Sequence, residues 1–141
     1  MSGLSPRLAH IVAALPLRPG LRMLEIGCGP GGMAREIAGR IGDGYVLAID
    51  RSATAIRQAI AGSAAELASG RLGLRQVAVE DFELAPGEAP FDLAVAVRVG
   101  VLDGRHPRAG EQARRRIAAA LTPGARLYID GGTPLREVTL P

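Results

Sequence analysis

Residues 21–41, LRMLEIGCGPGGMAREIAGRI, contain the stretch that decides the fold. Its first seven residues, LRMLEIG, form a short apolar run that is ended by glycines, as is typical of a buried strand. Behind the glycines, Met33, Ile37 and Ile41 recur every four residues, which is the spacing of one face of a helix. The stretch therefore predicts a buried strand, a glycine-rich turn and a helix, in that order.

The alternation of strand and helix continues along the chain. The helix after Ser52 is predicted to run to Leu67 with Ile60 on its buried face, and the last nine residues contribute a short extended piece at most. Strands joined by helices form parallel sheets that are covered on both faces. We expect one α/β domain over residues 1–141: a doubly wound, Rossmann-like open sheet of about five parallel strands. Besides 21–27, the expected strands are 45–50, 74–81, 91–99 and 126–131, and the expected helices are 6–15, 32–41, 53–67 and 110–121.

The composition excludes several classes of protein. Apolar runs stay well below the ~20 residues that cross a bilayer, and LAHIVAAL near the N-terminus is closed by prolines rather than a cleavage site, so we expect a cytoplasmic protein. All 17 basic residues are arginine, the net charge is +3 and aromatic residues make up 3%. The cluster Arg114–Arg116 is typical of a solvated helix face, and a nucleic-acid partner is not expected. With Cys28 as the only cysteine, neither an intramolecular disulfide nor a metal site is expected.

A glycine turn and two carboxylates follow the first two predicted strands, where ligands bind in open α/β sheets. Gly27, Gly29 and Gly32 satisfy the dinucleotide pattern G-x-G-x-x-G, which is equally compatible with a structural turn. Glu25 would repel a pyrophosphate and attract a cationic ligand. Asp50 is placed to accept hydrogen bonds from a ribose diol. Together they predict a nucleoside that carries positive charge, while the structural alternatives are an ordinary strand-end carboxylate and a helix N-cap.

With these residues identified, the sequence resembles the class I S-adenosylmethionine-dependent methyltransferases over about residues 20–132. LEIGCGPGG is similar to their glycine-rich first motif, AID to the strand end that binds ribose, and LTPGARLYIDGG to the fifth-strand motif. The segment VEDFELAPGEAPFDLAVAVRV resembles their third and fourth strands. The resemblance implies S-adenosylmethionine as the cofactor. It places Glu25, Gly27, Gly29 and Gly31 around the methionine part, Asp50 at the ribose, and Arg51, Asp81 and Phe82 at the adenine.

Further residues complete the predicted site. Cys28 in the turn and Arg98 after the fourth strand join the expected cofactor-binding set, although Cys28 also suits a small packed residue and Phe82 a plain core residue. Asp103 and His106 lie near the loop that is expected to face the methyl group, and either is a candidate base for the acceptor's proton. The structural alternative is a polar turn followed by a solvated histidine.

Two departures from the family pattern bear on the acceptor. Only nine residues follow Gly132, so the usual sixth and seventh strands are not expected, the fifth strand would be an open edge, and we predict a homodimer. The end of the fourth strand reads Arg98-Val99-Gly100-Val101, where some nitrogen-methylating relatives have an Asn/Asp-Pro-Pro-Tyr segment. This argues against methylation of DNA adenine or protein glutamine. A small-molecule acceptor is favoured, and the alternatives are a non-catalytic cofactor-binding subunit or sensor and an NAD-dependent oxidoreductase.

Overall fold

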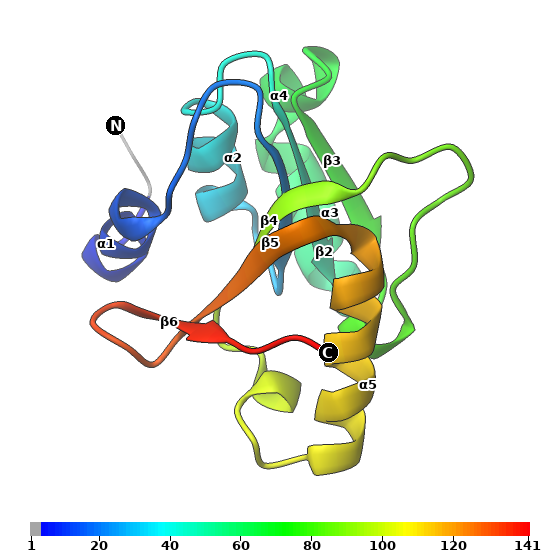
Figure 1. The fold of residues 1–141 in the computed structure, drawn as a ribbon. Helices are drawn as coiled ribbons and strands as arrows, with labels where there is room; N and C mark the ends of the chain where they lie inside the picture. Colours follow the sequence, from blue (N-terminus) through cyan, green and yellow to red (C-terminus); the bar gives the residue numbers. More distant parts are fainter. Residues whose placement is uncertain (1–3) are drawn as a thin grey trace.

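The computed structural model describes residues 4–141, and its centre is a six-stranded sheet with the order β3-β2-β1-β4-β5-β6 (Figure 1). The first five strands are parallel to their neighbours, and β6 runs antiparallel to β5. The sheet confirms the predicted doubly wound, Rossmann-like arrangement. The strands are β1 (Arg22–Ile26), β2 (Tyr45–Asp50), β3 (Leu72–Gln76), β4 (Phe91–Ala96), β5 (Leu121–Asp130) and β6 (Leu135–Val138).

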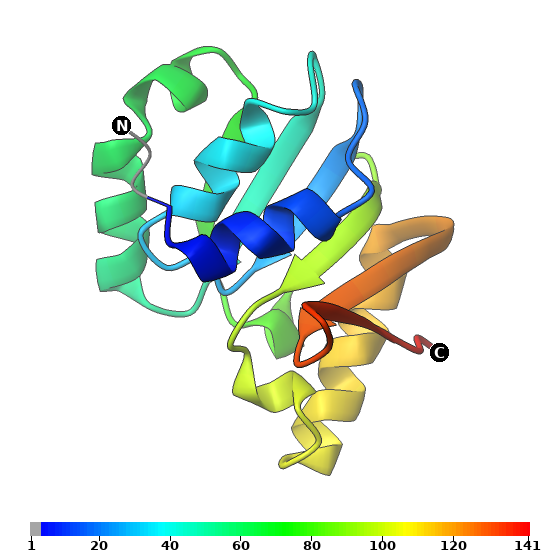
Figure 2. The same cartoon turned by 90° about the vertical axis from the view of Figure 1, so that its left-hand side faces the viewer.

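Helices cover both faces of this sheet, with α1 and α2 on one side and α5 on the other (Figure 2). Successive side chains of a strand point to opposite faces, so Met23 of β1 packs with Ile37 under α2, whereas Leu24 packs with Ile117 under α5. The helices are α1 (Pro6–Ala14), α2 (Gly32–Ala38), α3 (Ala53–Gly62), α4 (Ala64–Ala68) and α5 (Pro107–Ala120), with the 3-10 turns η1 (Val79–Asp81) and η2 (Gly100–Leu102).

Two helices begin at serine caps. The Ser5 hydroxyl accepts a hydrogen bond from the Leu8 amide at 3.3 Å, and the Ser52 hydroxyl accepts one from the Ala55 amide at 3.1 Å. Each cap satisfies an amide that has no partner within its helix. Because Ser52 caps α3 two residues after the end of β2, Asp50 lies at the junction of strand and helix.

The helix predicted over 53–67 is interrupted at Ser63, which separates α3 from α4. Ser63 is fully buried, and its hydroxyl accepts a hydrogen bond from Arg35 of α2 at 3.0 Å. This tertiary contact holds the break. The predicted apolar face is also wrong at Ile60, which is 48% exposed, whereas Ile56 and Ala59 of the same helix are buried.

The third strand ends earlier than predicted, at Gln76 rather than at residue 81. Gln76 pairs with Asp50, the last residue of β2, so the segment beyond it has no neighbouring strand with which to continue the ladder. The chain turns instead into η1 and a loop, which brings residues 77–80 across the end of the sheet.

The prediction that β5 is an open edge is wrong, because β6 pairs with it from Leu127↔Val138 to Asp130↔Leu135. The expected short extended piece of the last nine residues is therefore a strand of the sheet. None of the helices within residues 4–141 combines the length and the apolar character that a membrane span requires.

Candidate functional site

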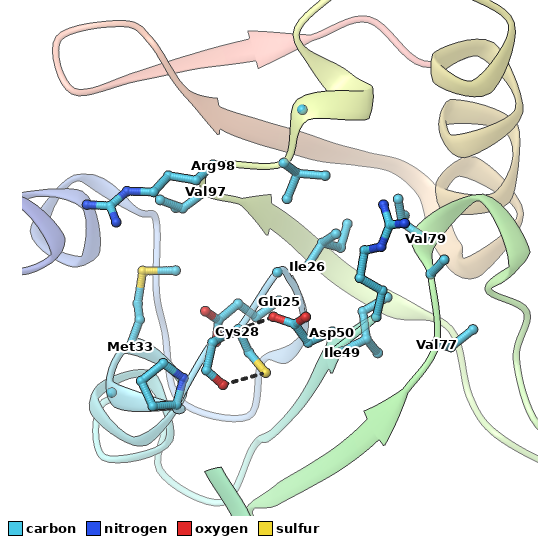
Figure 3. A pocket seen from close by; sticks show the side chains of 18 of the residues that line it. Glu25, Ile26, Cys28, Met33, Ile49, Asp50, Val77, Val79, Val97 and Arg98 are labelled. Atoms are coloured by element: carbon cyan, nitrogen blue, oxygen red, sulfur yellow. Dashed lines mark hydrogen bonds between the residues drawn. The ribbon is translucent and has the colours of Figure 1, made fainter. Parts of the chain in front are cut away.

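A cavity of about 520 Å³ lies at the carboxyl ends of β1, β2 and β4, and Figure 3 shows it from close by. From β1 the chain continues to β2, toward one edge of the sheet, and from β4 it continues to β5, toward the other edge. The strand order therefore reverses between β1 and β4. Such a point is the usual ligand site of an open α/β sheet. The structure brings seven of the predicted residues together in its lining: Glu25, Gly27, Cys28, Gly29, Asp50, Arg51 and Arg98.

The glycine turn forms the floor of the cavity. The amides of Gly27 and Cys28 both donate to the Ile49 carbonyl, at 2.8 and 3.0 Å, which fastens the turn to β2. Gly27 has a φ of +78°, and a β-carbon there would come within 2.8 Å of a methyl group of Val99. Glycine is therefore required at this position both by the backbone conformation and by the close approach of the loop after β4.

Glu25 is the most unusual residue of the cavity. It is only 2% exposed, and its Oε1 forms no hydrogen bond within the described part of the chain. Burial, with a further contribution from the charge of Asp50, raises the pKa of the Glu25 carboxyl to about 8. A buried carboxylate without partners is costly, so the site is poised to gain from a cation or a hydrogen-bond donor placed against Oε1.

Asp50 is held in a fixed orientation by the backbone. Its Oδ2 accepts a hydrogen bond from the Gly29 amide at 2.9 Å, and its Oδ1 accepts one from the Ser52 amide at 2.9 Å. Each carboxylate oxygen retains acceptor capacity after one such bond. Asp50 therefore presents oriented acceptors to the cavity, an arrangement that suits a pair of vicinal hydroxyl groups.

Cys28 is a packed residue and not a nucleophile at neutral pH. Its side chain is buried, and Sγ lies 3.5 Å from the Gly29 carbonyl. Burial first, and then the charges of Glu25 and Asp50, raise the pKa of the thiol to about 12. Because the thiolate is the reactive form, this cysteine contributes shape to the turn.

The wall beyond Asp50 consists of residues that the sequence reasoning missed. Residues 77–80 line the cavity, whereas Asp81 and Phe82 do not. Phe82 is 1% exposed and belongs to the core beneath α5, with the Arg75 guanidinium 5.7 Å from its ring centre. The adenine contacts at Asp81 and Phe82 are implied by the family resemblance, and they stay predictions. The apolar run Val-Ala-Val directly after the true strand end is the signal that would have found residues 77–80.

The opposite wall combines the loop after β4 with α1. Arg98 has a φ of +59°, in the left-handed region that few residues other than glycine adopt. Its amide donates to Asp130 Oδ1 at 3.1 Å, and Arg7 of α1 pairs with Asp130 Oδ2 at 2.6 Å. Asp130 thus joins α1 to this loop, and Leu8 of α1 becomes part of the cavity wall. The sequence offered no signal for this long-range contact.

The remaining predicted residues lie outside the cavity. Gly31 is the N-cap of α2, with a φ of +91°. Asp103 accepts hydrogen bonds from the Arg105 amide at 3.0 Å and from the Arg105 side chain at 2.6 Å, and these bonds lower the pKa of the Asp103 carboxyl. It lines a second, neighbouring cavity. His106 is exposed at the start of α5 and lines neither cavity. Catalytic roles for Asp103 and His106 stay predictions.

Comparison with solved structures shows the same fold in several methyltransferases. An S-adenosylmethionine-dependent methyltransferase from Mesorhizobium loti is 24% identical, with a TM-score of 0.66 over 88% of this chain and 50% of its own. Phosphoethanolamine N-methyltransferase 2 of Haemonchus contortus is 27% identical, with a TM-score of 0.68 over 87% of this chain and 27% of its own. A putative methyltransferase of Haloferax volcanii, solved with the activator Trm112, is 20% identical, with a TM-score of 0.70 over 87% of this chain and 50% of its own.

This chain therefore spans half or less of the length of these three structures. A search of curated proteins found no significant match. A sequence model of the methyltransferase domain family matches residues 23–124, which include the glycine turn, both carboxylates, β1 from Met23 onward, and β2 to β4. The chain belongs to the methyltransferase domain family.

Proposed function

We propose that the protein binds S-adenosylmethionine in the cavity at the ends of β1, β2 and β4 and transfers its methyl group to a small acceptor. The single observation that carries the proposal is the buried carboxyl of Glu25 with its unpartnered Oε1. A ligand with a positively charged amino or sulfonium group relieves this unfavourable burial. A dinucleotide offers no such relief, because its pyrophosphate would add negative charge beside Asp50 and would oppose ionisation of Glu25.

The lining residues fit the parts of such a ligand. Glu25 and the backbone at Gly27 would hold the methionine part, since the missing β-carbon leaves room at the turn. Asp50 would accept hydrogen bonds from the ribose hydroxyls, with its orientation already set by two backbone amides. The apolar side chains of Val77 and Val79 would contact the adenine ring.

S-adenosylmethionine, when bound, would supply an activated methyl group for in-line displacement by the acceptor. The chain's own contribution is mainly one of position. Asp50, fixed by two backbone amides, would orient the nucleoside, and the apolar Leu8 of α1 would limit the access of water to the cavity. Asp103 would be a weak base, because its pKa is lowered by its bonds to Arg105.

A small acceptor suits the dimensions of the cavities. Both have volumes within the usual range for small-molecule sites, at about 520 and 460 Å³. Small acceptors also occur among the structural neighbours, since one phosphoethanolamine methyltransferase was solved with phosphoethanolamine and S-adenosylhomocysteine. A cytoplasmic location, a single domain over residues 1–141 and a homodimer remain predictions.

Calorimetric titration with S-adenosylmethionine, S-adenosylhomocysteine and NAD tests the ligand assignment. We expect binding of the first two, a large loss of affinity in Asp50→Ala, and no change in the control Asp43→Ala, which removes an exposed carboxylate from the loop before β2. Binding of NAD alone would overturn the proposal. Release of S-adenosylhomocysteine during an acceptor screen then tests transfer, and tight cofactor binding without turnover on any acceptor would identify a binding subunit or sensor instead.

A further inference from the structure

A second cavity, of about 460 Å³, lies at the carboxyl ends of β4 and β5. Its lining includes Arg98, Val99 and Gly100, which also line the cofactor cavity, so the two spaces adjoin along the loop after β4. A molecule held in the second cavity would be next to the cofactor. This is the position that a methyl acceptor has to occupy if the function proposed above is correct.

Both carboxylates of this second cavity are already neutralised by neighbouring arginines. Asp130 uses Oδ2 for the ion pair with Arg7 at 2.6 Å and Oδ1 for the amide of Arg98 at 3.1 Å. Asp103 pairs with Arg105 at 2.6 Å and accepts the Arg105 amide as well. Each of these two negative charges is therefore balanced by an arginine.

Two further arginines line the same cavity without such compensation. Within residues 4–141, the guanidinium groups of Arg98 and Arg136 form no hydrogen bond or ion pair, and both residues are exposed. Arg98 extends from the end of β4 on the other side of the cofactor cavity from Asp50 (Figure 3). Its backbone is in the left-handed region, with a φ of +59°, which few residues other than glycine adopt. Strained positions of this kind cluster at ligand sites.

We propose that the second cavity binds a negatively charged group of the acceptor, a carboxylate or a phosphate, through Arg98 and Arg136. A guanidinium matches the geometry of both groups, because two parallel N–H bonds can reach two oxygens of the same anion. The excess of uncompensated positive charge selects against cationic acceptors. This inference rests on the proposed function and adds the chemical class of the acceptor to it.

The test uses the native chain and two probe anions, inorganic phosphate and acetate, at constant ionic strength maintained with chloride. Arginine side-chain N–H signals are followed by NMR, and phosphate affinity is measured for wild type, Arg136→Gln and the control Arg18→Gln. Arg18 is an exposed arginine in the loop before β1, outside both cavities. We expect saturable shifts at Arg98 and Arg136, and a loss of affinity of about tenfold or more in Arg136→Gln only.

Saturation by phosphate alone or by acetate alone supports the proposal and identifies the anion. Shifts that do not saturate, or that are equal at Arg18, overturn it. Every titration is repeated with saturating S-adenosylhomocysteine, which separates the two proposals. Binding of S-adenosylhomocysteine without saturable anion binding removes the acceptor inference and leaves the cofactor assignment standing. Anion binding by a chain that does not bind S-adenosylhomocysteine refutes the proposed function, and with it the role of this cavity as an acceptor site.

Discussion

Replacement of Glu25 by glutamine should change how the stability of the protein depends on pH. In the folded protein the pKa of this carboxyl is raised to about 8 from an ordinary value of 4.5. Between these two pH values the folded state keeps a proton that the unfolded state releases, so the free energy of unfolding falls as the pH rises. The full difference corresponds to about 5 kcal/mol. Relaxation of the site reduces this difference, and we expect the measured free energy of unfolding of the wild type to fall by at least about 2 kcal/mol over this pH range.

The same carboxyl links cofactor binding to pH. A cation bound against Glu25 stabilises the ionised form and lowers its pKa, so binding near neutrality should release a proton. The affinity for S-adenosylmethionine should therefore rise with pH until about 8, where the carboxyl of the free protein itself ionises. S-adenosylhomocysteine keeps the amino group but lacks the sulfonium charge, so its smaller dependence on pH would measure the contribution of the sulfonium.

Urea unfolding at several pH values between 5 and 9 and calorimetry in two buffers with different ionisation enthalpies measure the two effects. We expect Glu25→Gln to remove most of the pH dependence of unfolding and nearly all of the proton release. The control Glu83→Gln changes a carboxyl whose side chain is 80% exposed and should behave as wild type. Parallel unfolding curves for wild type and Glu25→Gln, together with cofactor binding that releases no proton, would refute the reasoning.

Two other substitutions separate packing from binding. Gly27→Ala should lower the free energy of unfolding by about 1–3 kcal/mol and weaken cofactor binding, because its β-carbon would meet Val99 at 2.8 Å. Gly124→Ala controls for backbone strain, since Gly124 has the same φ of +78° and a β-carbon there would have no atom within 4 Å. Equal losses of stability in the two variants would contradict the clash with Val99. Phe82→Leu should lower the free energy of unfolding, measured in urea, by about 1–2 kcal/mol, because residue Phe82 is only 1% exposed. The affinity for S-adenosylhomocysteine should not change, since the ring lies outside the cavity. A marked fall in this affinity would indicate that the ring contacts the adenine.

The predicted elements that proved accurate are those whose signal is local. The strand, turn and helix around Glu25 follow from hydrophobic spacing and glycine, and Asp50 follows from the end of the next apolar run. The errors arose where a distant partner decided the outcome. Arg35 holds the break at Ser63 within a stretch of helical spacing, and β3 ends where its neighbour β2 ends. Neither partner is close in sequence, so periodicity alone could not reveal it.

From the sequence alone came the order of the five parallel strands along the chain, the glycine turn, and the presence of two carboxylates at neighbouring strand ends. The tertiary structure alone decided that Glu25 is buried without a partner for Oε1, since desolvation depends on everything packed around a side chain. It also brought Arg7 against Asp130, 123 residues away, and Arg98 and Arg136 into one cavity. Spacing along a chain determines which face of an element a residue occupies, whereas charge and burial at a site depend on which distant elements meet there.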